Sequence, residues 1–171
     1  MVPFAGYEMP VQYPLGIMGE HKHTREKAGL FDVSHMGQVV LSGDGAPAAL
    51  ETLVPADIKA LGVNRMRYSQ FTNDKGGILD DLMITNRGGD LFLVVNAACK
   101  AQDVAHMRAK IGGRVKITEL PERALLALQG PQAAAVMDRL APGAATMKFM
   151  SYAAMDVAGF PCFVTRSGYT G

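Results

Sequence analysis

The sequence predicts an α+β fold in which helices pack on antiparallel sheets. The first observation is the stretch 68–96, where three short runs of strand-forming residues are separated by two loops rich in Asn, Asp and Gly. Gly and Asn tolerate the positive φ of tight turns, so each loop is expected to join antiparallel neighbours. The second observation is the order of the elements, which runs strands, helix, strands, helix, strands with short links. This order favours an α+β protein over a doubly wound parallel sheet.

The individual elements follow from local composition. Pro3, Gly6, Pro10 and Pro14 exclude a long helix from residues 1–15, so we expect an extended segment there. Helices bounded by Gly or Pro are predicted at 21–28, 45–54, 97–110 and 131–141. Strands are predicted at 31–43, 68–72, 78–85, 91–96, 115–120 and 124–130, followed by a closing hairpin that turns at 159–161. The Gly pairs inside 68–96 match hairpin turns and neither GxGxxG nor a P-loop.

Charge and composition exclude several classes of function. The 171 residues include 17 Lys or Arg and 16 Asp or Glu, and neither sign forms a long run. A nucleic-acid groove or a polybasic membrane surface would need clustered Lys and Arg, so we expect no nucleic-acid or membrane partner. Cys99 and Cys162 lie far apart and lack the spacing of a metal site or a disulfide framework, so a reducing compartment fits best. No apolar run approaches the roughly 20 residues of a membrane span, and the first ten residues do not resemble a signal peptide.

The strand predicted at 78–85 carries two acidic residues among apolar ones. Alternation places Asp80 and Asp81 on opposite faces, both otherwise mostly apolar, so the strand is expected to be central and covered on both sides. Burial of an unpaired polar group costs about 2–7 kcal/mol and a charge costs more, so at least one carboxylate is expected to meet a partner, a polar cavity or a ligand. The alternative is that these acids accept hydrogen bonds from backbone N–H groups of the preceding turn.

Two further polar side chains are expected beside these acids. If residues 86–90 form a hairpin loop, antiparallel pairing brings Asn96 next to Asp80 and Asp81. Tyr68, on the adjacent strand, is expected at the same side of the sheet. A carboxylate, a carboxamide and a phenol separated by apolar residues are typical of a pocket for a flat ligand with polar edges. Asn96 also precedes a predicted helix, where Asn is a good N-cap, and it can serve both purposes.

Asp32, Ser34 and His35 are the residue types of a hydrolase triad. On a single extended strand Ser34 and His35 point to opposite faces, so their side chains cannot form the hydrogen bond that nucleophilic catalysis requires. The sequence also lacks a GxSxG elbow. We therefore expect Asp32 and Ser34 to cap and turn the chain.

Six separated blocks of the sequence match a known family in order and spacing. They are FAGYEMPVQY (4–13), LFDVSHMGQ (30–38), YSQFTNDKGGILDDL (68–82), VVNAA (94–98), ALLALQGP (124–131) and TRSGYTG (165–171). Together they resemble the aminomethyltransferase family of the glycine cleavage system, the T-proteins. The resemblance implies two interleaved ferredoxin-like subdomains, the first at about 1–42 plus 126–171 and the second at about 43–125. In the family the last block continues into a Glu-Asp-Gly segment and a C-terminal domain, so we expect this chain to be a fragment of the folate-binding region that is inactive by itself.

The resemblance also implies a chemistry. T-proteins take an aminomethyl group from the lipoyl arm of the H-protein, release ammonia and pass the one-carbon unit to tetrahydrofolate, giving 5,10-methylenetetrahydrofolate without a metal. The second Asp of the family's GG-[IL]-[IL]-D-D-L block lies near the attacking folate nitrogen, which makes Asp81 the expected catalytic residue. A bacterial member would be cytoplasmic, and a eukaryotic one would lie in the mitochondrial matrix. The residues expected to bind the folate are Tyr68, Asn96, Met36, Asp80 and Arg166.

Three alternatives belong to other classes of function. Folate-binding proteins that assist iron–sulfur cluster assembly carry a Lys-Gly-Cys-Tyr-x-Gly-Gln block where this chain has SGYTG (167–171), which disfavours that role. The folate domains of enzymes that oxidise dimethylglycine or sarcosine are more similar, but they require an attached flavoprotein. The third alternative is a folate-binding module without catalysis.

Overall fold

The computed structural model describes residues 1–169, which form two compact units. The first unit comprises residues 1–35, 124–147 and 154–162. The second comprises residues 36–123 and 148–153 and the described residues from 163 onward. Every pairing of strands for which the register is described is antiparallel, and the predicted α+β class is confirmed.

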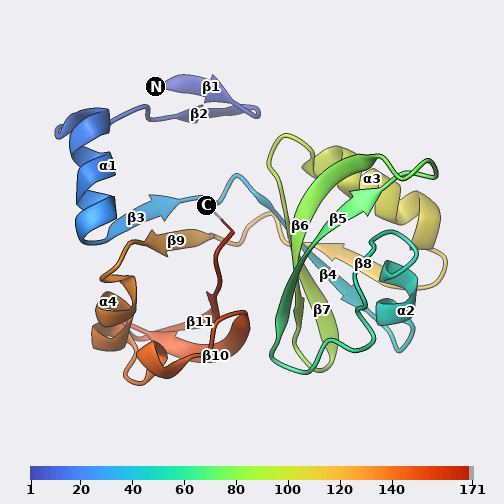
Figure 1. The fold of residues 1–171 in the computed structure, drawn as a ribbon. Coiled ribbons are helices and arrows are strands. Elements are labelled where there is room, and N and C mark those ends of the chain that lie inside the picture. The colour runs from blue at the N-terminus through green and yellow to red at the C-terminus, as the bar shows by residue number, and fades with distance from the viewer. Residues whose placement is uncertain (170–171) are drawn as a thin grey trace. The chain divides into compact units, whose positions relative to one another are not determined.

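The second unit is built on a five-stranded antiparallel sheet in the order β5-β6-β7-β4-β8 (Figure 1). Its strands are β4 (Gly37–Ser42), β5 (Met66–Thr72), β6 (Ile78–Asn86), β7 (Asp90–Val95) and β8 (Lys116–Glu119). Helices α2 (Ala46–Leu50) and α3 (Lys100–Ile111) lie against one face of this sheet (Figure 1). The core forms between them because alternate strand residues and one stripe of each helix are apolar; its fully buried members include Leu41, Leu50, Leu82, Ile84, Leu93, Val95 and Met107.

Strand β6 is central, as predicted. Leu82 and Ile84 are fully buried in the core shared with the helices, while Met83 and Thr85, on the opposite face, are only 4% and 1% exposed. Both faces are therefore covered at these positions, and this explains why consecutive residues from Leu82 to Ile84 are apolar.

The strand register brings three chain positions to one end of this sheet. Leu82 pairs with Val95, and Val95 also pairs with Gly37, so continuing both ladders by one residue places Asp81 and Met36 opposite Asn96. A Cβ atom at Gly37 would lie only 2.6 Å from Val95 Cγ2, so glycine is needed for this close approach. Strand pairing thus sets the lateral order Asp81, Asn96, Met36.

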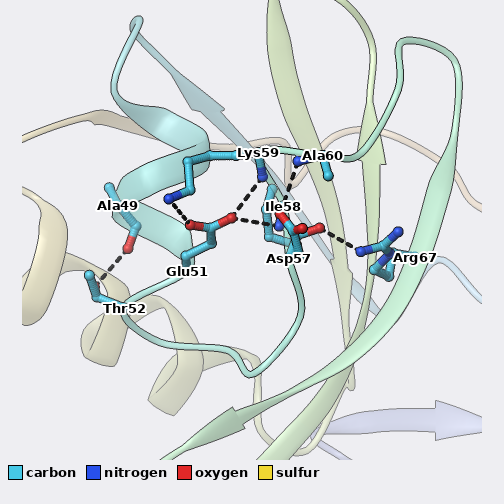
Figure 2. Close-up of polar contacts among 8 residues, drawn as sticks. All are labelled: Ala49, Glu51, Thr52, Asp57, Ile58, Lys59, Ala60 and Arg67. Atoms are coloured by element: carbon cyan, nitrogen blue, oxygen red, sulfur yellow. Dashed lines mark hydrogen bonds and ion pairs between the residues drawn. The ribbon is translucent and has the colours of Figure 1, made fainter.

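The loop after α2 is held by one carboxylate, shown in Figure 2. Oε1 of Glu51 accepts hydrogen bonds from the backbone N–H groups of Ile58 at 2.9 Å and Lys59 at 2.8 Å, and Oε2 pairs with Lys59 Nζ at 2.8 Å. Asp57 caps the same turn by accepting from the Ala60 N–H at 3.0 Å. These contacts satisfy backbone donors that have no partner in a regular element.

The first unit consists of short elements. They are β1 (Val2–Phe4), β2 (Tyr7–Met9), α1 (Gly16–Glu26), β3 (Gly29–Asp32), β9 (Leu126–Gln129), α4 (Ala133–Leu140) and the 3₁₀ turn η1 (Ala144–Thr146). The last two strands are β10 (Ser151–Val157) and β11 (Phe160–Arg166). Residues 154–162 of these strands and their turn belong to the first unit, and the rest belongs to the second. Strands β3 and β9 pair with each other, as do β1 and β2. Gly130 has φ +110°, and its missing side chain leaves room for the carbonyl of Lys27 at the end of α1.

Several predicted boundaries are wrong. The segment 1–15 contains the β1–β2 hairpin, and α1 begins at Gly16 rather than residue 21, because Gly16 at φ +70° closes a turn onto the Tyr13 carbonyl. The strand predicted at 31–43 is two strands, β3 and β4, since the Ser34 N–H is bound by Asp32 and the chain turns there. Helix α2 is shorter than predicted, at five residues.

The division into units can be compared with the subdomains expected at about 1–42 plus 126–171 and about 43–125. The largest differences are at β4 and at residues 163–169, both of which lie in the second unit. Strand β4 lies there because it pairs with both β7 and β8. The boundaries of the family subdomains stay a prediction.

Candidate functional site

Asp81, on β6, accepts hydrogen bonds from three side chains. The Tyr68 hydroxyl of β5 donates to its Oδ2 at 2.8 Å. Its Oδ1 accepts from Asn96 Nδ2 at 2.6 Å and from the Tyr169 hydroxyl at 2.7 Å. Each donor comes from a different segment, so the cluster forms only when the sheet and the segment after β11 are in place. The expected proximity of Tyr68, Asp81 and Asn96 is confirmed.

The orientation of the Asn96 amide follows from its partners. One Nδ2 hydrogen is given to Asp81 and the other to Asp80 Oδ1 at 2.9 Å, so both donors are used. The amide oxygen lies 3.2 Å from the Tyr169 hydroxyl, which has a single hydrogen and lies closer to Asp81. Asn96 Oδ1 therefore keeps capacity to accept a hydrogen bond from a ligand.

Asp80 holds Asn96 from the helix-covered face of the sheet. Its Oδ2 accepts from the Asn96 backbone N–H at 3.3 Å, in addition to the amide contact on Oδ1. Its partner across the strands is Phe71, which is fully buried in the core. The prediction that the two acids of β6 face opposite ways is consistent with this arrangement, because Asp81 meets Tyr68 on the other face.

Both alternative interpretations of these polar residues are wrong. The turn before β6 takes its hydrogen bonds from Asn73, whose Oδ1 accepts from Lys75 N at 2.9 Å and Gly77 N at 3.0 Å, and the two acids are not needed there. Asn96 is also not a helix N-cap, because α3 begins at Lys100, its N-cap is Cys99 and no side chain caps it. The side chain of Asn96 is therefore committed to the carboxylates.

The cluster keeps its anionic charge at neutral pH. Burial disfavours the charged form of Asp81, but the hydrogen bonds from Tyr169, Tyr68 and Asn96 together outweigh it and hold the pKa of Asp81 below its usual 3.8. Burial, followed by the hydrogen bond to Asp81, raises the pKa of Tyr169 well above that of an ordinary phenol. Tyr169 thus stays a neutral donor while Asp81 stays an acceptor.

The side-chain donors of the cluster, the two phenol groups and the Asn96 amide, give their hydrogens to the carboxylates, so the groups that remain available to a ligand are acceptors. A carboxylate has about four lone-pair sites, and three are filled by the described donors to Asp81. The remaining site on Asp81 and the oxygen of Asn96 suit a ligand that presents N–H groups along one edge. The same carboxylate would also stabilise positive charge that develops on a bound nitrogen.

The positions of Met36 and Arg166, the two other expected site residues, are known from strand register and chain order. Met36 is half-buried and lies opposite Asn96 in the register, one residue before β4. Arg166 is the last residue of β11, three positions before Tyr169; its side chain is exposed and its carbonyl accepts from Met150 N at 2.7 Å. The ligand-binding roles of Met36 and Arg166 stay predictions.

Sequence reasoning missed two members of the cluster. Tyr169 lies in the block TRSGYTG, from which Arg166 and not Tyr169 was named as a site residue. Asp103 of α3 is 1% exposed and interacts with Asp80. It could have been found from spacing, because Asp103, Met107 and Ile111 recur at intervals of four and so share the buried face of the helix.

The residues of the supposed triad have structural roles. Ser34 Oγ donates to the Leu125 carbonyl at 3.4 Å and accepts from the Leu125 N–H at 3.0 Å, while Asp32 Oδ1 accepts from Ser34 N at 3.0 Å. His35 packs against the rings of Phe4 and Tyr7. Asp32 and Ser34 turn the chain, as expected.

The cavities described in the second unit lie away from Asp81. One of about 420 Å³ is lined by residues 119–123, and one of about 550 Å³ is lined by Glu51, Lys59 and their neighbours; both are open to solvent. The predicted pocket beside Asp81 therefore rests on hydrogen-bond geometry. Within residues 1–169, no helix has the length and apolar character to cross a membrane, and no three His, Cys, Asp or Glu side chains converge as a metal site would require.

Comparison with known proteins gives a consistent result. Residues 1–171 match the GCVT N-terminal domain family. A mitochondrial aminomethyltransferase from Dictyostelium discoideum is 45% identical over 181 residues, which cover 100% of this chain and 45% of that protein. The crystal structure of the glycine cleavage system aminomethyltransferase T from Bartonella henselae superimposes with a TM-score of 0.89 and 42% identity, covering 99% of this chain and 46% of that one.

A more distant structure shows the same fold. The heterotetrameric sarcosine oxidase from Corynebacterium sp. U-96 matches with a TM-score of 0.60 and 19% identity, over 82% of this chain and 71% of that one. The present chain spans less than half of the aminomethyltransferases that it matches. Because the family match covers the whole chain, and the predicted resemblance is confirmed by sequence and by structure, this protein belongs to the GCVT N-terminal domain family.

Proposed function

We propose that this chain forms the folate-binding part of an aminomethyltransferase of the glycine cleavage system. The full-length enzyme transfers the one-carbon unit of the aminomethyl group on a lipoylated H-protein to tetrahydrofolate. Ammonia and dihydrolipoyl H-protein are released, and 5,10-methylenetetrahydrofolate is formed. Tetrahydrofolate is the acceptor substrate, and no metal takes part.

The observation that carries this proposal is the anionic cluster at the end of β6. The Asp81 carboxylate is held by Tyr68, Tyr169 and Asn96, and it retains one acceptor site beside the amide oxygen of Asn96, which itself keeps acceptor capacity. A reduced pterin presents an amino group and ring N–H groups along its edges, which matches such a pair of acceptors.

Each residue of the cluster has a distinct role in this proposal. Asp81 stabilises the positive charge that develops on the folate nitrogen while that nitrogen forms its bond to the aminomethyl carbon, a charge that exists only along the reaction path. Tyr68 and Tyr169 fix the carboxylate, and Asn96 with Asp80 binds the pterin edge. Met36 supplies an apolar contact, and Arg166 contributes positive charge for the anionic part of the folate.

Folate-dependent oxidation of dimethylglycine or sarcosine is the second candidate. The likeness to the sarcosine oxidase is 19% in sequence, against 42–45% for the two aminomethyltransferases. We therefore place aminomethyl transfer first. The lipoylated H-protein is the proposed partner, and the compartment is the cytoplasm of a bacterium or the matrix of a mitochondrion.

The proposal is tested with the full-length protein that contains this sequence. Purified protein, aminomethylated H-protein and tetrahydrofolate should yield ammonia and methylenetetrahydrofolate in equal amounts. Absence of the product with an H-protein that a known aminomethyltransferase accepts would overturn the assignment. A sarcosine- or dimethylglycine-dependent product would favour the second candidate.

Residues 1–171 alone provide a second test. A site built from several segments loses affinity when part of its wall is missing, because the remaining groups are desolvated without full burial of the ligand. We expect this chain to bind tetrahydrofolate at least about tenfold more weakly than the full-length protein and to show no transfer. Equal affinity of the two in parallel calorimetric titrations would mean that the Asp81 cluster holds the pterin unaided.

A further inference from the structure

Asp103 is an acid buried in the apolar face of helix α3. It is 1% exposed and shares that face with Val104, Met107 and Ile111. Its Oδ2 atom is buried and has no hydrogen-bond donor among the residues that the structure describes. An ionised carboxylate in this position would be an unpaired buried charge, which folded proteins avoid by pairing or by neutralisation.

Within residues 1–169, the titratable groups that interact with Asp103 are acidic. The side chain of Asp80 on β6 is its hydrogen-bonding neighbour, and the Cys99 thiol and Asp81 lie in the same group of mutually interacting side chains. His106, on the same helix, instead packs against the ring of Phe71 and leaves its Nε2 without a partner in the described part. A buried carboxyl group beside a second carboxyl group is disfavoured as an anion by both its burial and its neighbour, so the arrangement favours one proton held by this pair.

The position of that proton is decided by what Asp80 already accepts. Both oxygens of Asp80 receive hydrogen bonds from Asn96, one from its amide at 2.9 Å and one from its backbone N–H at 3.3 Å. Asp80 therefore acts as an acceptor, whereas the bare Oδ2 of Asp103 accepts nothing. A proton on Asp103 makes its carboxyl group a donor toward Asp80 and removes the repulsion between the two groups.

We propose that Asp103 is a protonated acid that donates a hydrogen bond to Asp80 and thereby acts as a positioning residue for the ligand site. The effect passes through Asp80 to the Asn96 amide and from there to Asp81. Loss of the proton would place two carboxylates face to face, turn Asp80 away from Asn96 and release the amide that orients Asp81. Burial, followed by the hydrogen bond to Asp80 and the charge of Asp80, raises the pKa of Asp103 to about 8, so the proton is retained at neutral pH.

The protonation state is tested without reference to any ligand. The measurement is an infrared difference spectrum of the full-length protein, wild type minus Asp103→Asn, near neutral pH. We expect the band of a protonated carboxylic acid, which fades as the pH rises through about 8. Asp74→Asn is the matched control, because the side chain of Asp74 is 91% exposed and its difference spectrum should show only a carboxylate band. A carboxylate band for Asp103 would overturn the proposal.

The thermodynamic consequence has a definite sign. Because the pKa of Asp103 is higher in the folded state than its ordinary 3.8, the folded protein binds one more proton than the unfolded chain between these pH values. Stability from this group is complete below pH 3.8 and is lost as the pH rises through about 8. In Asp103→Asn this extra proton is absent, so the number of protons released on unfolding over this pH range should fall by one. An unchanged number of released protons would contradict the proposal.

The positioning role rests on the proposed binding of folate. Asp103→Asn keeps a donor toward Asp80, and we expect its tetrahydrofolate affinity to stay within about threefold of wild type near neutral pH, whereas Asp103→Leu should lose about tenfold. Wild-type affinity should fall as the pH rises through about 8, and that fall should be absent in Asp103→Asn. Equal losses in both variants, with the acid band present, would reject the positioning role. Failure of the wild type to bind folate would reject the proposed function, and the infrared result would still stand.

Discussion

The second unit contains two groups of acidic side chains, and they are built differently. Glu51, after α2, accepts two backbone N–H groups and pairs with Lys59, all within nine residues of chain (Figure 2). Asp80 and Asp81 on β6 are held by Asn96 and by two phenols, and one of these phenols, Tyr169, lies 88 residues away in the chain. Each carboxylate receives three donors, but the Glu51 charge is paired with the Lys59 ammonium, while the described donors to Asp81 are two phenols and an amide.

The comparison distinguishes acids that stabilise a loop from acids that form a site. The Glu51 charge is neutralised by a lysine, and the hydrogen bonds with that lysine lower the pKa of Glu51 from 4.5 to about 2. Among the residues that the structure describes, the side chain of Asp81 accepts hydrogen bonds from the neutral groups of Tyr68, Asn96 and Tyr169, and its pKa is lowered against the effect of burial. A carboxylate that stays charged beside phenols and an amide leaves its negative charge for a ligand.

The largest expected effect tests the β6 group directly. Asp81→Asn keeps the shape of the side chain and removes its charge. In the full-length enzyme we expect turnover to fall at least about a hundredfold, or about 2.7 kcal/mol of transition-state stabilisation, with a smaller loss of folate affinity. Steady-state kinetics with aminomethylated H-protein give the result, and Glu51→Gln serves as the control that should keep wild-type turnover. Activity of Asp81→Asn within about threefold of wild type would remove Asp81 from the chemistry.

The next effect concerns the donors to Asp81. Tyr169→Phe removes a hydrogen bond to a charged group, and we expect about a tenfold loss of folate affinity, or about 1.4 kcal/mol. Tyr68→Phe should cost less, because Tyr68 is 45% exposed and water can replace its hydroxyl.

Tyr169→Phe should also change how folate binding depends on pH. Asp81 is ionised above its lowered pKa and loses its charge as the pH falls through that value. Removal of the Tyr169 hydroxyl leaves burial in place and removes a donor, so the acidic limb of folate binding should move to higher pH. An NMR titration of the Asp81 carboxyl carbon measures this shift, and an unmoved midpoint would mean that Tyr169 does not support the charge.

A smaller effect is expected at Glu51, and it concerns stability alone. Because the pKa of Glu51 is depressed from 4.5 to about 2 in the folded state, its charge stabilises the fold above pH 4.5, and this contribution is lost as the pH falls through about 2. Glu51→Gln should therefore lower the melting temperature at neutral pH and have little effect on it below about pH 2. Melting curves recorded across this range decide, and a deficit that persists at low pH would show that the charge is not the cause.

The smallest effect is expected at Lys59. Its side chain is 65% exposed, and exposed ion pairs contribute little because water and salt screen them. Lys59→Met should change the melting temperature less than Glu51→Gln does, since the two backbone hydrogen bonds to Glu51 remain. A loss larger than that of Glu51→Gln would mean that the ion pair, and not the backbone contacts, holds this loop.

Local rules were sufficient for part of the molecule. Strand alternation placed Asp80 and Asp81 on opposite faces of a central strand, and the turn chemistry of 73–77 and 86–90 gave the hairpins that bring Asn96 beside them. These inferences were correct because side-chain direction and turn geometry depend on a few consecutive residues. The six sequence blocks also identified the family, because their residues and spacing can be compared with other sequences without knowledge of the fold.

Only the tertiary structure decided which groups complete the cluster. Tyr169 reaches Asp81 because the segment after β11 returns to β6, and Asp103 meets Asp80 because α3 packs on the sheet. The turn that separates β3 from β4 was also missed, although Asp32 and Ser34 were expected to turn the chain. Contacts between distant segments depend on the path of the whole chain and on the burial that this path imposes. Sequence alone therefore determined the family, the central strand and the acids it presents, while the folded structure supplied the remaining hydrogen-bond partners, and the hydrogen bonds to Asp81 keep that carboxylate charged against the effect of burial.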